Sequence, residues 1–173
     1  MTYDFLRDGQ SLAEFIRQFE QGTLPKPMWT HAAHLAVGTW YLVTLAEATA
    51  AEATAAEATA VEAMAVERVR SGIRHYNECV GTANTPDSGY HETLTLFWLK
   101  TIREFLRDPD DVGKLEAVRR VVEEFGAQRD LFKKYYSFDV VASRQARAGW
   151  VPPDRIVSTY VSNPGNKSTL RDI

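Results

Sequence analysis

The chain has 173 residues, of which 45% are hydrophobic, and this size and composition favour a single domain with an ordinary apolar core. Its formal net charge of −3 argues against nucleic acid and anionic membranes as partners. The sequence shows no apolar run of about eighteen residues and no secretion signal. It has a single cysteine, and this excludes an internal disulfide. We therefore expect a cytoplasmic protein that binds a small molecule, and the sequence is compatible with a homodimer.

Residues 11–22 predict the first helix. Ser11 and Glu14 have the spacing of a capping box, an apolar stripe of helical period follows, and Gly22 ends the pattern. The proline-rich segment 23–29 is expected to be a stiff loop, because a residue that precedes proline prefers an extended conformation.

Thr30 is a good N-cap for a second helix, which begins with two of the four histidines of the chain, His31 and His34. Positions three residues apart lie on the same face of a helix, and this face continues through Gly38 and Tyr41. We expect both histidines to point inward. Gly38 has no side chain, so another helix could approach the second helix closely at this point.

Residues 46–65 form an Ala/Glu/Thr repeat with a period of five. Each repeat offers a Thr-x-x-Glu capping box, at Thr49–Glu52, Thr54–Glu57 and Thr59–Glu62, where one helix could end and another begin. An unbroken helix over residues 30–80 would be about 75 Å long, which is too long for a small domain. We expect a break within the repeat and interpret the repeat as an insertion at a helix connection.

A third helix is predicted up to Gly81, with Asn77 on its inner face and His75 on the side that faces solvent. A turn-rich loop follows, and Asp87 or Ser88 is the expected N-cap of a fourth helix.

The buried face of the predicted fourth helix carries His91 near its middle and Glu92 at its edge. A fifth helix is expected after residues 108–111, and a last helix is expected to end before Pro152. No long segment alternates with a period of two, so strands are not expected. The fold class is therefore an all-α, compact single-domain bundle of five to seven helices over residues 1–155, with 156–173 as a loosely held tail.

The inward histidines are candidate metal ligands. Helical bundles build metal sites from side chains on facing helices, and His31, His34 and His91 would supply three imidazoles. Imidazole ligands without cysteine suit zinc, iron, nickel or copper, and Glu92 would be the catalytic general base. This interpretation predicts a metal-dependent enzyme that acts on a small polar molecule. The walls of its pocket would be the polar residues Tyr41, Asn77, Tyr90 and Thr95 and the apolar residues Trp29 and Trp98.

Two alternatives stay open at this point. In the first, the protein is metal-free, and the histidines and Glu92 either bind a small molecule or exchange protons with it as an acid–base enzyme. In the second, the protein is a non-enzymatic helical interaction protein, and its histidines are hydrogen-bonded members of the core.

Three segments carry a resemblance to a known family. The strings WTHAAHLAVGTWYL (29–42), GYHETLTLFWL (89–99) and YYSFDVVASRQARAGWVPPD (135–154) together resemble a family of small bacterial helical proteins of uncharacterised function. Its motifs are Thr/Ser-His-x-x-His-Leu, Tyr-His-Glu-Thr-x-Thr and Ser-x-x-Ala-Arg before a Pro-Asp. The resemblance implies that His31, His34, His91 and Glu92 form one site and adds Arg147 as a candidate substrate-binding residue. It implies no reaction.

Overall fold

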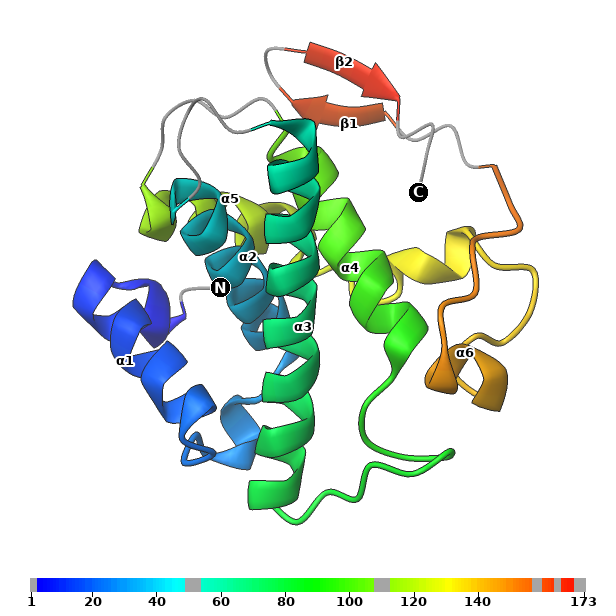
Figure 1. The fold of residues 1–173 in the computed structure, drawn as a ribbon, viewed down its shortest axis with the longest axis horizontal. Coiled ribbons are helices and arrows are strands. Elements are labelled where there is room, and N and C mark those ends of the chain that lie inside the picture. Colours follow the sequence, from blue (N-terminus) through cyan, green and yellow to red (C-terminus); the bar gives the residue numbers. More distant parts are fainter. Residues whose placement is uncertain (1–2, 49–53, 108–112, 157–159, 164–165, 170–173) are drawn as a thin grey trace.

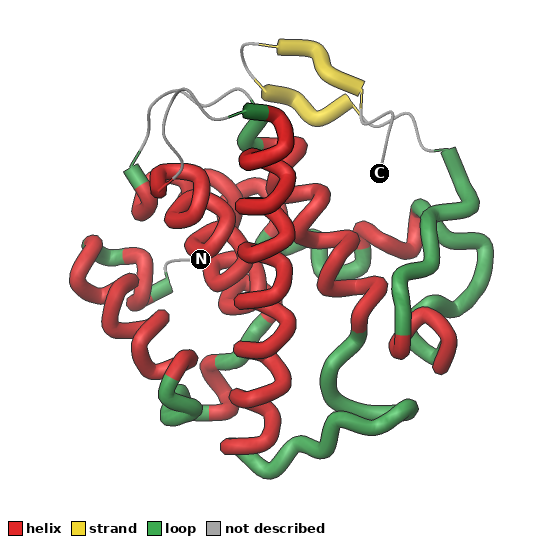
Figure 2. Tube along the Cα trace, viewed as in Figure 1, coloured by secondary structure: helices red, strands yellow, loops and turns green. Residues whose placement is uncertain are grey.

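The computed structural model describes residues 3–48, 54–107, 113–156, 160–163 and 166–169. Six α-helices occur in these residues, which confirms the all-α class and the expected five to seven helices (Figures 1 and 2). The helices are α1 (Gly9–Glu20), α2 (His31–Ala48), α3 (Ala55–Cys79), α4 (Glu92–Phe105), α5 (Lys114–Phe125) and α6 (Arg144–Ala148). Short 3₁₀ turns occur at Asp4–Leu6, Lys26–Met28 and Leu131–Lys134. Within the described ranges, no helix is both long and apolar enough to cross a membrane.

Helix α2 lies at the centre of the bundle and packs against α3, α4 and α5 (Figure 1). Its first turns are mostly apolar, with Ala32, Ala33 and Leu35 buried, and a helix of this kind is stable only when other elements pack around it. Helix α1 packs against α3 and α5, and α6 packs against α4. The histidine pair therefore begins the most central helix of the fold.

The close approach of another helix at Gly38 is confirmed. A Cβ atom on Gly38 would lie 3.1 Å from Cδ2 of Leu99 and 3.2 Å from Cδ1 of Ile102, and both of these residues belong to α4. The missing side chain lets α4 pack directly on the backbone of α2. This contact joins the middle of α2 to the second half of α4.

The break within the Ala/Glu/Thr repeat is also confirmed, because α2 ends at Ala48 and α3 begins at Ala55. Thr54 caps α3 with one of the predicted capping boxes: its side chain accepts from the backbone N–H of Glu57 at 3.3 Å, and Glu57 accepts from the backbone N–H of Thr54 at 2.7 Å. The Thr49–Glu52 box lies outside the described residues.

Two expectations about the ends of the chain's elements need correction. The N-cap of α1 is Asp8, not Ser11: the Asp8 side chain accepts from the backbone N–H of Ser11 at 2.7 Å, so the helix begins three residues earlier. The predicted tail contains a hairpin of β1 (Tyr160–Asn163) and β2 (Asn166–Thr169), although no strands were expected. Its strands flank the dipeptide Pro-Gly, which favours a turn, and a short strand pair of this kind leaves little alternation to detect.

Candidate functional site

His34 lies in the first turn of α2, and one hydrogen bond determines its tautomer. Thr30 caps the helix as expected, with its hydroxyl accepting from the backbone N–H of Ala33 at 3.4 Å. The carbonyl of Thr30 lies 2.7 Å from Nδ1 of His34. Because a carbonyl can only accept, Nδ1 carries the proton and Nε2 keeps a lone pair. Among the described residues, no hydrogen-bond partner meets this Nε2.

The ring of His34 packs against the edge of an aromatic cluster. Its ring lies 4.0 Å from the ring of Trp29, which in turn packs on Phe19 and Tyr76 at 4.9 Å and 4.8 Å. The side chain of His34 is exposed to solvent, so the expectation that it points inward is wrong. The surrounding protein lowers its pKa to about 4. We call the exposed imidazole of His34 and the ring of Trp29 beside it the His34 site.

His31, one turn earlier, has the opposite tautomer. Its Nε2 lies 3.2 Å from the carbonyl of Phe125, at the end of α5, so Nε2 donates and Nδ1 is the bare nitrogen. The ring packs against Trp98 of α4, with centroids 4.6 Å apart. Burial lowers the pKa of His31, the Phe125 carbonyl opposes this, and the charges of Arg129 and Asp130 act in opposite directions. His31 is therefore a neutral, half-buried neighbour of His34.

His91 is buried, but it does not lie near the middle of the buried face of α4, where it was expected. It is the N-cap of that helix, so the N-cap is neither Asp87 nor Ser88. Its Nδ1 accepts from the backbone N–H of Leu94 at 3.3 Å, and its Nε2 donates to the carbonyl of Val140 at 3.0 Å. Both ring nitrogens are therefore used within the fold. This arrangement requires a neutral ring, and burial lowers the pKa of His91 accordingly.

Glu92 is held in an ion pair between α4 and α3. Its carboxylate accepts from Nε of Arg70 at 3.0 Å, from a second nitrogen of the same guanidinium, and from the hydroxyl of Tyr90 at 2.7 Å. Burial alone would raise the pKa of Glu92, but the hydrogen bonds from Arg70 and Tyr90 outweigh it and hold the pKa below its usual value. A carboxylate with three such donors is a weak base, so the geometry favours a structural role for Glu92.

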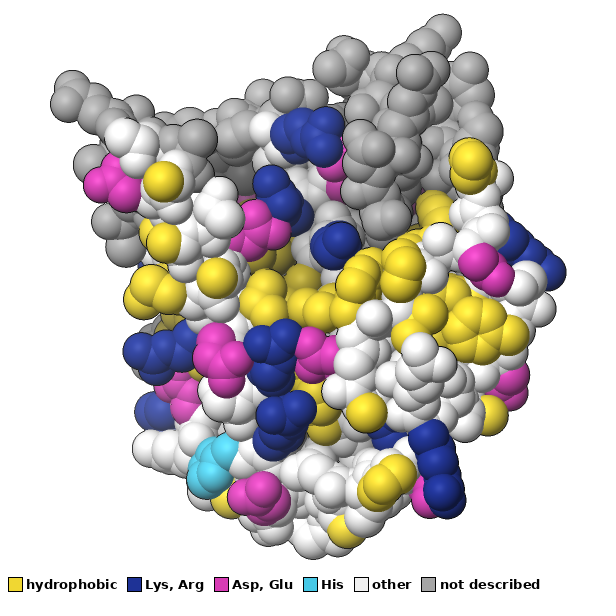
Figure 3. All heavy atoms as spheres, turned by 45° about the vertical axis from the view of Figure 1, so that its right-hand side comes forward, with side chains coloured by type: hydrophobic (Ala, Val, Ile, Leu, Met, Phe, Trp, Pro, Cys, Tyr) yellow, Lys and Arg dark blue, Asp and Glu magenta, His cyan; other side chains and the backbone are white. Residues whose placement is uncertain are grey.

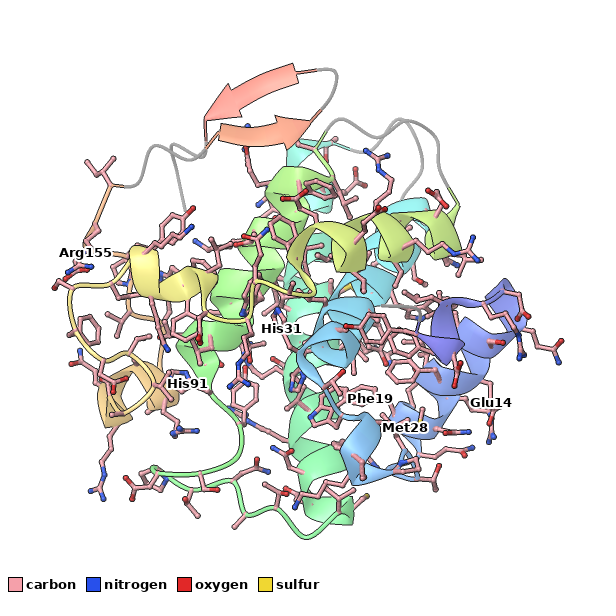
Figure 4. The ribbon with its side chains drawn as sticks, turned by 180° about the vertical axis from the view of Figure 1, so that it is seen from behind. Glu14, Phe19, Met28, His31, His91 and Arg155 are labelled. Carbon is pink, nitrogen blue, oxygen red and sulfur yellow. The ribbon has the colours of Figure 1, made fainter. Side chains whose placement is uncertain are left out.

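The histidines predicted to share one metal ion are held apart. His31 meets the end of α5, whereas His91 meets Val140 in the segment before α6, and Figure 4 shows the two side chains in different parts of the molecule. In the part of the chain that the structure describes, no group of three or more His, Cys, Asp or Glu side chains is placed to hold a metal ion. The metal site stays a prediction, and this geometry gives it no support.

Of the predicted polar pocket residues, Tyr90 and Thr95 lie beside Glu92 and His91, whereas Tyr41 and Asn77 bond to other parts of the fold. Each has a partner of its own within the fold. Tyr41 donates to Glu20 at 2.7 Å, Asn77 donates to Asn84 at 2.8 Å, Tyr90 donates to Glu92, and Thr95 donates to the carbonyl of His91 at 2.9 Å.

Arg147, suggested by the family resemblance, also has a structural position. It donates to the carbonyls of Gly89, Tyr90 and Val141 at 3.1–3.3 Å and so ties α6 to the loop before α4. Trp29 and Trp98, by contrast, lie against the histidines, where apolar walls were expected.

Sequence reasoning missed the groups that orient these side chains. Arg70 is 22 residues away from Glu92, and a buried carboxylate in need of a cation was the only signal for it. The carbonyls of Phe125 and Val140 carry no signal in the sequence, because every residue has a carbonyl.

Comparisons with protein-family models, with curated proteins and with solved structures found no match. The family resemblance therefore stays a prediction, and the interpretation of the site depends on its geometry.

Proposed function

We propose that the protein binds a small molecule without a metal ion, at the His34 site. The observation that carries this proposal is the state of His34: its ring is exposed to solvent, packs on Trp29 and presents a bare Nε2. A hydrogen-bond acceptor that is held beside an aromatic ring has the character of a ligand-binding group. The expectation that this protein works in the cytoplasm belongs to the same proposal.

The geometry favours binding over acid–base catalysis. A general base works best when its pKa lies near the working pH, whereas burial lowers the pKa of His34 to about 4. At neutral pH such a ring is an uncharged acceptor and only a weak base. Glu92, the predicted catalytic residue, is paired with Arg70 and is no better as a base.

A metal-dependent function is the second candidate, and one observation favours it. Nδ1 of His31 and Nε2 of His34 are both bare, and their residues lie three apart on α2, where side chains are neighbours. Neutral imidazoles are good ligands for zinc, nickel or copper. Two protein ligands are fewer than the three that catalytic zinc sites usually have, so this candidate ranks below metal-free binding.

Screening a library of small fragments by ligand-observed NMR tests the proposal. We expect fragments that bind wild-type protein and the control His75→Phe, whose position on α3 is exposed, but bind His34→Phe about fivefold more weakly. A chelator should not change these affinities. No binding by any fragment, or equal binding to His34→Phe, would overturn the proposal, and binding that the chelator abolishes would favour the metal-dependent candidate.

A further inference from the structure

Residues 137–151, which carry α6, form a surface loop that is closed at its base and packs against α4. We call this segment the α6 strap. We propose that the α6 strap is a hinged lid, which opens as a unit from the first turn of α4 while helices α1 to α5 stay packed, and so exposes Thr93. Three features carry the proposal: the closed base, the small apolar surface that the strap buries, and the buried hydroxyl that holds it down. None of them involves the His34 site, so the proposal is independent of the proposed binding function.

The base of the α6 strap is closed by hydrogen bonds between its two ends. The hydroxyl of Tyr136 donates to the carbonyl of Val151 at 3.0 Å, and the backbone N–H of Ser137 donates to the carboxylate of Asp154 at 2.7 Å. The hydroxyl of Ser137 donates to the same carboxylate, and the backbone N–H of Asp154 donates to the carbonyl of Tyr135 at 3.2 Å. A surface loop whose ends are joined in this way can move as a unit, because the elements on either side of it stay where they are.

The α6 strap also has hydrogen bonds of its own. The carboxylate of Asp139 accepts from the backbone N–H groups of Val141 and Ala142, at 3.1 Å and 3.2 Å. Ser143 caps α6, with its hydroxyl accepting from the backbone N–H of Ala146 at 3.2 Å. Because α6 has only five residues, it is too short to be stable away from α4. These internal hydrogen bonds are therefore lost together when the strap leaves α4, which makes the strap one cooperative unit.

The α6 strap buries little apolar surface against the helices. Its buried side chains are the small ones of Val140 and Ala146, and Trp150 at its end is half-buried. Phe138 and Val141, by contrast, are 40% and 41% exposed. Helix α6 lies at the edge of the molecule (Figure 1), and Figure 3 turns this side forward and shows apolar side chains open to solvent on it. Since apolar burial is the main force that holds a segment in place, the strap opens at a lower free energy than the helices beneath it.

Hydrogen bonds to the first turn of α4 hold the α6 strap in place. Thr93 is fully buried; its hydroxyl donates to the carbonyl of Gly149 at 2.7 Å and accepts from the backbone N–H of Val151 at 2.9 Å. Nε2 of His91 donates to the carbonyl of Val140 at 3.0 Å. The other attachments are the bonds from Arg147 to the carbonyls of Gly89 and Tyr90 and an ion pair between Arg144 and Asp87. Opening the strap frees the hydroxyl of Thr93 and the N–H of His91, so the strap controls the access of solvent to both.

Amide hydrogen exchange of the full-length protein at pH 7, followed by NMR, tests the lid. The reporters are the backbone N–H groups of Ala146, Arg147 and Gly149, whose acceptors lie within the strap. We expect the three to share one protection factor, at least about tenfold below that of the slowest amides of α2. Protection equal to that of α2 would overturn the proposal, because the strap would then open only when the whole fold does. Three unrelated protection factors would also overturn it, because the strap would not be a unit.

Two substitutions on α4 separate opening of the strap from unfolding of the whole protein. Thr93→Val keeps the shape of the side chain but removes the hydroxyl that holds the strap, so the protection of the three reporters should fall about tenfold. Thr101→Val is the matched control, because Thr101 is equally buried and its hydroxyl donates to the carbonyl of Phe97 within α4, at 2.9 Å. That bond stays intact when the strap opens. Thr101→Val should therefore lower the protection of α2 and leave that of the reporters within about twofold of wild type.

A third variant keeps the test open if Thr93→Val does not fold. In Arg144→Gln the lost ion pair with Asp87 is exposed, with 72% and 62% of the two side chains accessible, so the fold is retained. The protection of the reporters should fall about twofold. If Thr101→Val lowers the protection of the reporters as much as that of α2, or if neither Thr93→Val nor Arg144→Gln lowers it, the α6 strap is not a lid.

Discussion

Replacing Glu92 with alanine is expected to lower the free energy of unfolding by about 2–3 kcal/mol, because it leaves the Arg70 guanidinium partly buried without its main partner. The carboxylate has only 9% of its side-chain surface exposed, and Arg70 has 26%. Full burial would make the loss larger, and the partial exposure of Arg70 moderates it. Urea denaturation followed by circular dichroism measures the change.

Glu67 offers a matched control, because it pairs with the same arginine. Its side chain is 63% exposed, so Glu67→Ala should change stability by less than about 0.5 kcal/mol. Glu92→Gln keeps a polar side chain of the same size but removes the charge. Its free energy of unfolding should lie between those of wild type and Glu92→Ala. If Glu92→Ala is as stable as wild type but no longer binds the fragments, Glu92 belongs to the binding site and the structural interpretation is wrong.

The pH dependence of this pair has a definite sign. The pKa of Glu92 is lowered in the folded protein, so its contribution to stability is complete above the unfolded-state pKa of about 4.3 and is lost as pH falls through the lower folded value. The difference in stability between wild type and Glu92→Gln should therefore shrink only in acid, below that unfolded-state value.

The second large effect is expected at His91, where alanine should cost about 2 kcal/mol. The substitution removes the side-chain cap of α4 and the hydrogen bond to the carbonyl of Val140. Asparagine is a good N-cap, so His91→Asn should recover about 1 kcal/mol by accepting from the backbone N–H of Leu94. Thermal or urea unfolding of the two variants measures the loss of stability in His91→Ala and the recovery in His91→Asn. Equal losses in the two variants would contradict the capping role.

Protonation should weaken the same cap. The neutral ring accepts at Nδ1, whereas a protonated ring would present an N–H to the N–H of Leu94. Because burial lowers the folded-state pKa of His91, its stabilising contribution is complete above the unfolded-state value of about 6.5 and falls as pH drops below it. His91→Asn should lack this component, so its stability should depend less on pH than that of wild type below about pH 6.5.

Helical periodicity predicted several local features of this chain correctly. It placed His31 and His34 at the start of a helix and Gly38 at the contact with another helix, as the structure has them, but His34 is exposed and not inward. The Thr54–Glu57 capping box was visible for the same reason: local patterns determine local structure. The helix ends that were wrong, at Ser11 and near Asp87, had a competing cap within a few residues.

What each inward side chain meets could not be predicted in the same way. Periodicity gives the angle of a residue around its own helix, and it does not give the partner on another element. The predicted metal cluster assumed that three inward imidazoles converge, whereas His91 and His31 each reach a different backbone carbonyl. The ion pair between Glu92 and Arg70 depends equally on how α3 and α4 pack, and no local pattern encodes it.

The most direct test of this account is the protonation state of His34, measured by long-range ¹H–¹⁵N NMR from neutral pH into acid, with His34→Phe to assign the signal. We predict a neutral ring protonated at Nδ1 at pH 7, with a titration midpoint near the pKa of about 4. Such a result would establish a bare Nε2 acceptor, the group on which the proposed binding depends. A midpoint near 6.5, the value of a freely solvated histidine, or a proton on Nε2 would contradict the account.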